Sequence, residues 1–73
     1  AISPNESVTS QSRYQLIYAL CPLTLEWGTN HSQTLQTHEL LVIEQASPFQ
    51  EMTITFLPHQ SGEQPIAIWT GLQ

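Results

Sequence analysis

The sequence predicts a mainly β protein, either all β or small α+β, built on one antiparallel sheet of four or five short strands. Three observations carry this prediction. Apolar and polar residues alternate along several short segments, β-branched and aromatic residues are frequent in them, and proline or glycine separates them about every ten residues. The sheet either rolls into a barrel or packs against one helix. With 73 residues the chain forms one domain at most.

The chain opens with the polar stretch AISPNESVTSQS, in which only Ala1, Ile2 and Val8 are apolar. A segment of this composition buries too little surface to offset the entropy lost on ordering. We therefore expect a flexible N-terminal tail over residues 1–12 and a single strand-rich domain over residues 13–73.

The next segment, RYQLIYALCP at residues 13–22, fits two patterns. One set of apolar residues recurs at helical spacing: Tyr14, Ile17, Tyr18 and Cys21. Another set alternates as in a strand: Tyr14, Leu16, Tyr18 and Leu20. The two tyrosines favour a pleated surface, so a strand is preferred here, and a helix over residues 12–21 is the alternative.

Two strands are expected in the middle of the chain. Leu23, Leu25 and Trp27 alternate with polar residues, and the turn residues that start at Gly28 follow them. The segment LQTHELLVIEQ, residues 35–45, instead has apolar side chains on both parities, which is typical of a strand covered on both faces. We expect it to be the central strand, paired with its sequence neighbours as hairpins, and to end at the break Ser47-Pro48.

The last two expected strands form a C-terminal hairpin. Met52, Ile54 and Phe56 alternate with threonines, and a loop over residues 57–65 follows, with proline near both ends. The final segment IAIWTG, residues 66–71, is expected to place its isoleucines on one face and its Trp69 on the other.

Charge and cysteine content exclude several classes of function. The chain has six Glu, no Asp, no Lys and a single cation, Arg13, for a net charge of −5. Nucleic acid and anionic membrane surfaces are bound through many Lys and Arg residues, so neither is an expected partner. No apolar run approaches the roughly 18 residues of a spanning helix. The lone Cys21 favours a reducing compartment, so we expect a soluble, cytoplasmic protein.

No arrangement of residues predicts catalysis or a cofactor. His31, His38 and His59 lack the short spacings that pre-form a zinc site, so no metal site is expected. Cys21 ends an apolar run far from positive charge and is interpreted as a small buried residue rather than a nucleophile. Trp27, like the second tryptophan of the chain, is interpreted first as a core residue.

These observations predict a small acidic non-enzymatic module for protein–protein interaction, assembly or regulation, with a small ligand- or metal-binding domain as the alternative. The expected partner is a second copy of the chain or a basic protein surface. Without lysine, the sheet has little to guard its edges, and a marginal core gains from further burial. The expected interface combines C-terminal strand residues with two rim charges: Ile66, Ile68, Trp69, Glu39 and Glu44.

Overall fold

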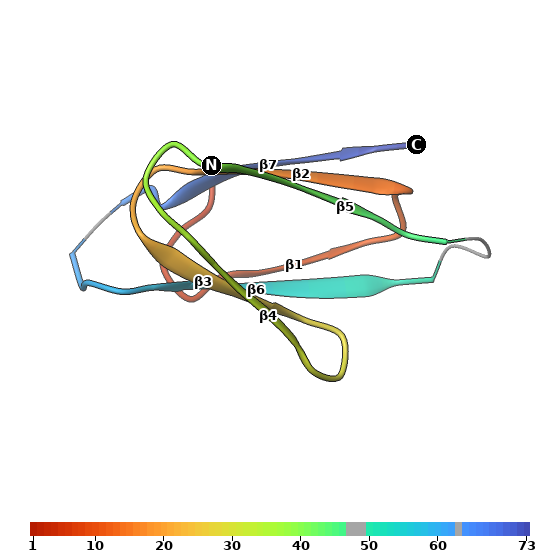
Figure 1. Cartoon of the computed structure of the whole chain (residues 1–73), viewed down its shortest axis with the longest axis horizontal. Helices are drawn as coiled ribbons and strands as arrows, with labels where there is room; N and C mark the ends of the chain where they lie inside the picture. Colours follow the sequence, from red (N-terminus) through yellow and green to blue (C-terminus); the bar gives the residue numbers. More distant parts are fainter. Residues whose placement is uncertain (47–49, 63) are drawn as a thin grey trace.

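In the part of the chain that the structure describes, seven strands form two antiparallel sheets that lie one above the other (Figure 1). This computed structural model describes residues 1–46, 50–62 and 64–73, and the strand break expected at Ser47-Pro48 lies outside them. The strands are β1 (Ser7–Ser10), β2 (Tyr14–Ala19), β3 (Leu23–Trp27), β4 (His31–Leu35), β5 (Leu40–Glu44), β6 (Met52–Pro58) and β7 (Ala67–Leu72). The mainly β prediction is confirmed, although the strands divide between two sheets that do not close into a barrel.

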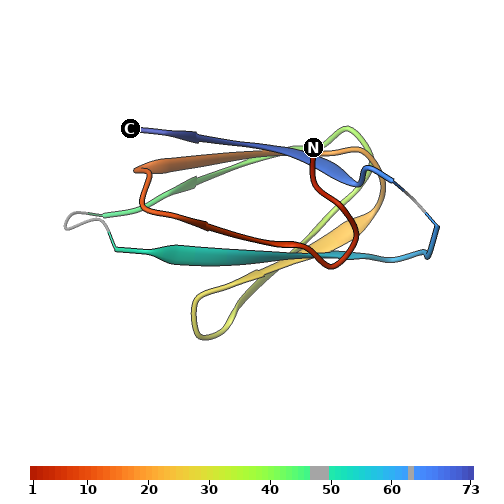
Figure 2. The same cartoon turned by 180° about the vertical axis from the view of Figure 1, so that it is seen from behind.

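The two sheets differ in width. One has four strands in the order β1-β6-β3-β4, and the other has three in the order β5-β2-β7. Figure 2 shows the same layers from behind, with the N-terminal segment running from the three-stranded layer to the four-stranded one. Among the described residues no helix is long and apolar enough to span a membrane.

The core fills the space between the sheets. The alternating residues of β3 and β6 that were expected to share a face do so, because one parity of each strand points at the opposite sheet. The isoleucines of the final segment do not, since Ile66, just before β7, is buried and Ile68 is exposed. The largest fully buried apolar side chains come from both layers and from the segment before β7: Phe56, Ile17, Leu23, Leu25, Ile54 and Ile66. Each contributes about 1.5–3 kcal/mol by leaving water.

Residues 14–19 form strand β2, so the strand interpretation of this segment is confirmed and the helix alternative is wrong. The strand pairs with β5 on one side and β7 on the other. Its buried parity consists of Gln15, Ile17 and Ala19, while the alternating tyrosines and leucine face outward. Because the polar Gln15 occupies the first buried position, the sequence pattern does not show which face of β2 points inward.

The N-terminal segment expected to be a tail packs into both sheets in the structure. Ile2 is buried and its N–H donates to the carbonyl oxygen of Ala67 at 2.8 Å. After Asn5, whose φ is 65°, the chain crosses to the other layer, where β1 pairs with β6. The composition argument failed because Ile2 and Val8 both meet the core, and because the threonines of β6 match the hydroxyls of β1.

The expected central strand is an edge strand. β5 pairs with β2 alone, and only Leu41 and Ile43 pack against the core. The opposite parity is open, with Leu40 59% and Val42 53% exposed. The expected hairpin pairings are also wrong, since β4 and β6 lie in the other sheet than β5, and β6 and β7 lie in different sheets. Apolar residues on both parities of a strand therefore do not show by themselves that both faces are buried. Burial of the outer face also requires a second layer that covers it.

Candidate interaction surface

The outer edge of β7 presents backbone groups that no described residue bonds. The hydrogen bond from the Ile2 N–H to the Ala67 carbonyl oxygen shows that the backbone groups of Ala67 point away from β2. Because these groups alternate sides along an antiparallel strand, the N–H and C=O of Trp69 and Gly71 face the same way. The edge is therefore open beyond Ala67 within the described part of the chain.

No charge guards this edge. Residues 64–73 contain no Asp, Glu, Lys or Arg. Native sheets usually blunt an edge with lysine, an inward charge or proline. The other edge of the same sheet, β5, ends in Glu44 and follows Glu39. The edges of the four-stranded sheet, β1 and β4, consist mostly of Ser, Thr, Gln and His. Of the two edges of its sheet, β7 is the uncharged one.

The outward side chains of the three-stranded sheet form a surface that we call the apolar face. Pairing registers set them in three rows across the sheet: Leu40, Tyr18 and Ile68; Val42, Leu16 and Thr70; Glu44, Tyr14 and Leu72. Seven of these nine are apolar or aromatic. All the large apolar residues found exposed in the described chain lie in these rows, with Ile68 47% and Leu72 48% exposed besides the two on β5. An apolar surface gathered in this way makes this face a candidate contact site.

The outer face of the four-stranded sheet is polar instead. Hydroxyl pairs join its strands, at 2.8 Å between Ser7 and Thr55 and at 3.0 Å between Thr9 and Thr53. Glu26 stands exposed among them. A two-sheet protein facing water on both sides would carry polar residues on both outer faces. The apolar face therefore departs from the pattern that the same chain follows on its other side.

One ion pair lies at a corner of the apolar face. The Arg13 guanidinium donates to the Glu44 carboxylate at 3.1 Å and also lies 5.0 Å from the centre of the Tyr14 ring. Both charged side chains are about half exposed, so the pair contributes under about 1 kcal/mol to folding. The ion pair also affects the charge of the surface, because it leaves the apolar face without net charge.

The predicted interface residues do not all come together. Ile66, Ile68 and Trp69 are neighbours at β7, but Ile66 is buried and Trp69 points inward. Glu39 and Glu44 belong to the opposite edge of the sheet, beyond β2. The Glu39 carboxylate accepts the Gln36 N–H at 2.6 Å, which closes the turn before β5.

Sequence reasoning missed most of the apolar face. Its central strand supplies Tyr14, Leu16 and Tyr18, whose alternation was recognised without a direction. Leu40 and Val42 were assigned to a covered strand. The sequence around Gln15 does hold a signal for this face. Gln15, Ile17 and Ala19 form one alternating set of β2, and the tyrosines and leucine form a second, apolar set. When one set packs into the core, the other is left facing outward.

Gln15 anchors Trp69 from inside the sandwich. The Trp69 indole N–H donates to the Gln15 Oε1 at 2.7 Å, and the Gln15 amide donates to the carbonyl oxygen of Ser12 at 3.1 Å. Gln15 is fully buried, and its bonds offset the desolvation of its amide. Both tryptophans are half-buried and pack against the core, as the core interpretation expects. Holding Trp69 inward turns its neighbours Ile68 and Thr70 outward.

The three histidines are bound in separate places. His38 Nδ1 lies 2.6 Å from the Tyr18 hydroxyl, and His59 Nε2 lies 2.8 Å from the Thr24 hydroxyl. The His31 ring stacks on Trp27, with ring centres 5.5 Å apart and an angle of 12° between the planes. Among residues 1–46, 50–62 and 64–73, no three potential ligand side chains gather as a metal ion requires.

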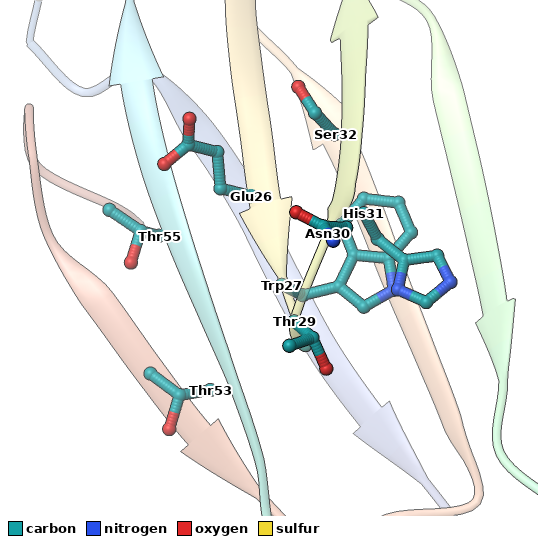
Figure 3. A pocket seen from close by; sticks show the side chains of 9 residues that line it. Glu26, Trp27, Thr29, Asn30, His31, Ser32, Thr53 and Thr55 are labelled. Atoms are coloured by element: carbon teal, nitrogen blue, oxygen red, sulfur yellow. The ribbon is translucent and has the colours of Figure 1, made fainter.

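An open hollow of about 480 Å³ lies at the turn between β3 and β4. Figure 3 shows Glu26, Thr53 and Thr55 on one side of it and the stacked Trp27 and His31 rings on the other. A carboxylate, hydroxyls and an aromatic ring suit a small polar molecule with an apolar side.

Cys21 is buried, and its thiol lies 3.9 Å from the carbonyl oxygen of Ile66. Its burial matches the interpretation of Cys21 as a small buried residue. Comparison of the chain with protein-family models, curated proteins and solved structures finds no match.

Proposed function

We propose that the chain is a non-enzymatic assembly module that joins a second copy of itself by sheet extension through β7. The observation that supports this proposal is the outer edge of β7, which is uncharged and unpaired beyond Ala67 within the described residues. An exposed edge of this kind pairs readily with another strand. The proposal includes a cytoplasmic location, because a single cysteine suits a reducing compartment.

The open edge selects one register for an antiparallel pair of β7 strands. Ala67 is already bonded by Ile2, which leaves Trp69 and Gly71 to donate and accept. Centring the pair on Thr70 places Trp69 opposite the second copy's Gly71, so that both sets of outward groups are bonded. The same register places Ile68 opposite the second copy's Leu72. Two side chains that are nearly half exposed in the single chain then cover each other.

Size gives a reason for the pairing. A chain of 73 residues buries a smaller fraction of its surface than a larger domain does, and its core only narrowly offsets the entropy lost on ordering. Binding a second folded copy stabilises the folded state by mass action. Pairing through β7 bonds the open backbone groups and brings no two carboxylates together, since residues 64–73 hold none.

A cysteine cross-link tests the register. Thr70 would face the second copy's Thr70 in a pair without direct backbone bonds, where Cα atoms lie about 4.5 Å apart. This separation fits a disulfide, which spans about 4.4–6.8 Å between Cα atoms. We expect Thr70→Cys to form a covalent dimer on mild oxidation at micromolar concentration. Thr34→Cys is the matched control, because Thr34 is also an exposed threonine within an edge strand, on the other sheet.

Both cysteine variants retain the buried Cys21, so its contribution is equal in the two. The proposal is refuted if Thr70→Cys cross-links no faster than Thr34→Cys while circular dichroism reports the same β structure for both. Stronger cross-linking of Thr34→Cys would instead move the contact to the four-stranded sheet.

The hollow beside Trp27 supports a second candidate function, the binding of a small polar ligand. Its aromatic wall and the Glu26 carboxylate are the features that favour it. A native mass spectrum of protein taken from cells separates the two functions. A mass increase of a few hundred daltons that Trp27→Ala abolishes supports the ligand, whereas a mass of two or four chains supports the assembly module. A basic protein as partner would appear as a third mass, lost as salt screens the net charge of −5.

A further inference from the structure

Pairing through β7 leaves the apolar face open. Residues that oppose each other in an antiparallel pair project to the same side of the sheet. Thr70 of both copies therefore points the same way, and the two apolar faces join into one surface six strands wide. The exposed residues of β5 and the outward row of β2 remain in water in this dimer, since β7 pairing covers only Ile68 and Leu72.

The size of the face decides how it is covered. Three strands about 4.8 Å apart, with five residues of about 3.4 Å each, give a flat area of roughly 240 Å² per copy. A stable specific interface buries about 800 Å² from each partner. One face offers under a third of that area as flat sheet, whereas two joined faces offer roughly 480 Å², and in both cases the projecting side chains add accessible area.

Charge selects the occupant. Two copies that each carry −5 repel each other over most of their surfaces. On the apolar face, Arg13 neutralises Glu44, the only carboxylate in its rows. The opposite outer face displays the exposed Glu26, which forms no ion pair within the described residues, and is covered with hydroxyls. A second copy meets neither obstacle if it approaches with its own apolar face.

We infer that the apolar faces of two β7-paired dimers pack against each other and give an assembly of four copies. Sheets packed face to face lie about 10 Å apart with interleaved side chains. The symmetry is closed, because one two-fold axis relates the paired edges and a second relates the packed faces, as in common tetramers. This inference rests on the proposed function, since the area argument needs the joined face.

The test is sedimentation of Val42→Glu beside the matched control Thr34→Glu. Both residues are exposed, β-branched and within an edge strand, but Val42 lies on the apolar face and Thr34 on the polar one. We expect four copies for the wild type and Thr34→Glu, and two copies for Val42→Glu. Four new carboxylates would enter the packed interface, so the tetramer's dissociation concentration should rise at least about 100-fold.

Each outcome bears on one contact. A wild type of two copies, unchanged by Val42→Glu, overturns the face packing and leaves the β7 pairing intact; another molecule then covers the face. A monomeric wild type, with Thr70→Cys no faster to cross-link than Thr34→Cys, overturns the proposed function together with the inference. Cross-linking of Thr70→Cys that persists in the Val42→Glu chain supports both contacts as separate. If Val42→Glu fails to fold by circular dichroism, Leu40→Glu replaces it on the same face.

Discussion

The bond between Trp69 and Gln15 ties β7 to β2, and its removal gives a prediction whose size follows from the structure. The Trp69 indole N–H has the Gln15 Oε1 as its acceptor at 2.7 Å, and Gln15 is fully buried. Gln15→Leu keeps an apolar stem but leaves the indole N–H without that acceptor. The other partners of Gln15 are less affected, because the Ser12 carbonyl oxygen also accepts the Gln45 amide at 3.2 Å.

Gln15→Leu should lower the free energy of unfolding by about 1–3 kcal/mol, the cost of leaving one buried polar group unpaired. Trp69→Phe should lower the free energy of unfolding by a similar amount, because it leaves the Gln15 Oε1 without its donor. The smaller phenyl ring should add a further loss of packing. The double variant removes both polar partners, so its loss should fall short of the sum by about 1–2 kcal/mol. A 73-residue domain has roughly 4–11 kcal/mol in total, so these losses are large.

Urea unfolding followed by far-ultraviolet circular dichroism measures all four free energies. One protein concentration is used throughout, because association stabilises the folded state. Trp27→Phe combined with Gln15→Leu is the control cycle, since Trp27 stacks on His31 in the other sheet. Additivity within about 0.5 kcal/mol for the Gln15 and Trp69 pair would refute the reasoning. It would mean that the indole N–H finds another acceptor.

Two further predictions concern the ends of β7 and β5. A methyl group added by Gly71→Ala would lie 2.6 Å from the Ser12 Oγ, so we expect a loss of about 1–3 kcal/mol in urea unfolding. Ser12→Gly in the same chain should recover most of it, and equal stability of Gly71→Ala and wild type would contradict the close approach. Glu44→Gln removes the ion pair with Arg13, both half exposed, and should cost about 0.2–1 kcal/mol. That loss should vanish in about 1 M salt; a loss that survives there would show that the pair acts through packing.

The positions of most strands could be predicted from the sequence. Alternation located β3 and β6, and in β2, where alternation left strand and helix both open, the two tyrosines favoured the strand. These predictions succeeded because period two is a local property, visible within five or six residues. Turn residues such as Gly28, whose φ is 63°, are local in the same sense.

The N-terminal segment shows where local reasoning ends. Its mean composition predicted a tail, yet Ile2 and Val8 suffice to attach it, because β6 and the start of β7 offer edges to pair with. The availability of a partner edge is not written in the segment that uses it. The order of strands is non-local as well, since Tyr14 pairs with Leu72 at the far end of the chain.

The candidate surface divides in the same way. By itself the sequence determined the net charge of −5, the absence of lysine and the uncharged C-terminal strand, and these features support the proposal of β7 as a contact edge. Only the tertiary structure decided that Leu40 and Val42 lie beside Leu16 on an uncovered face, while Glu39 and Glu44 lie across the sheet from β7. The physical reason is that alternation distinguishes the two faces of a strand but does not say which of them another layer covers. That depends on how distant segments pair.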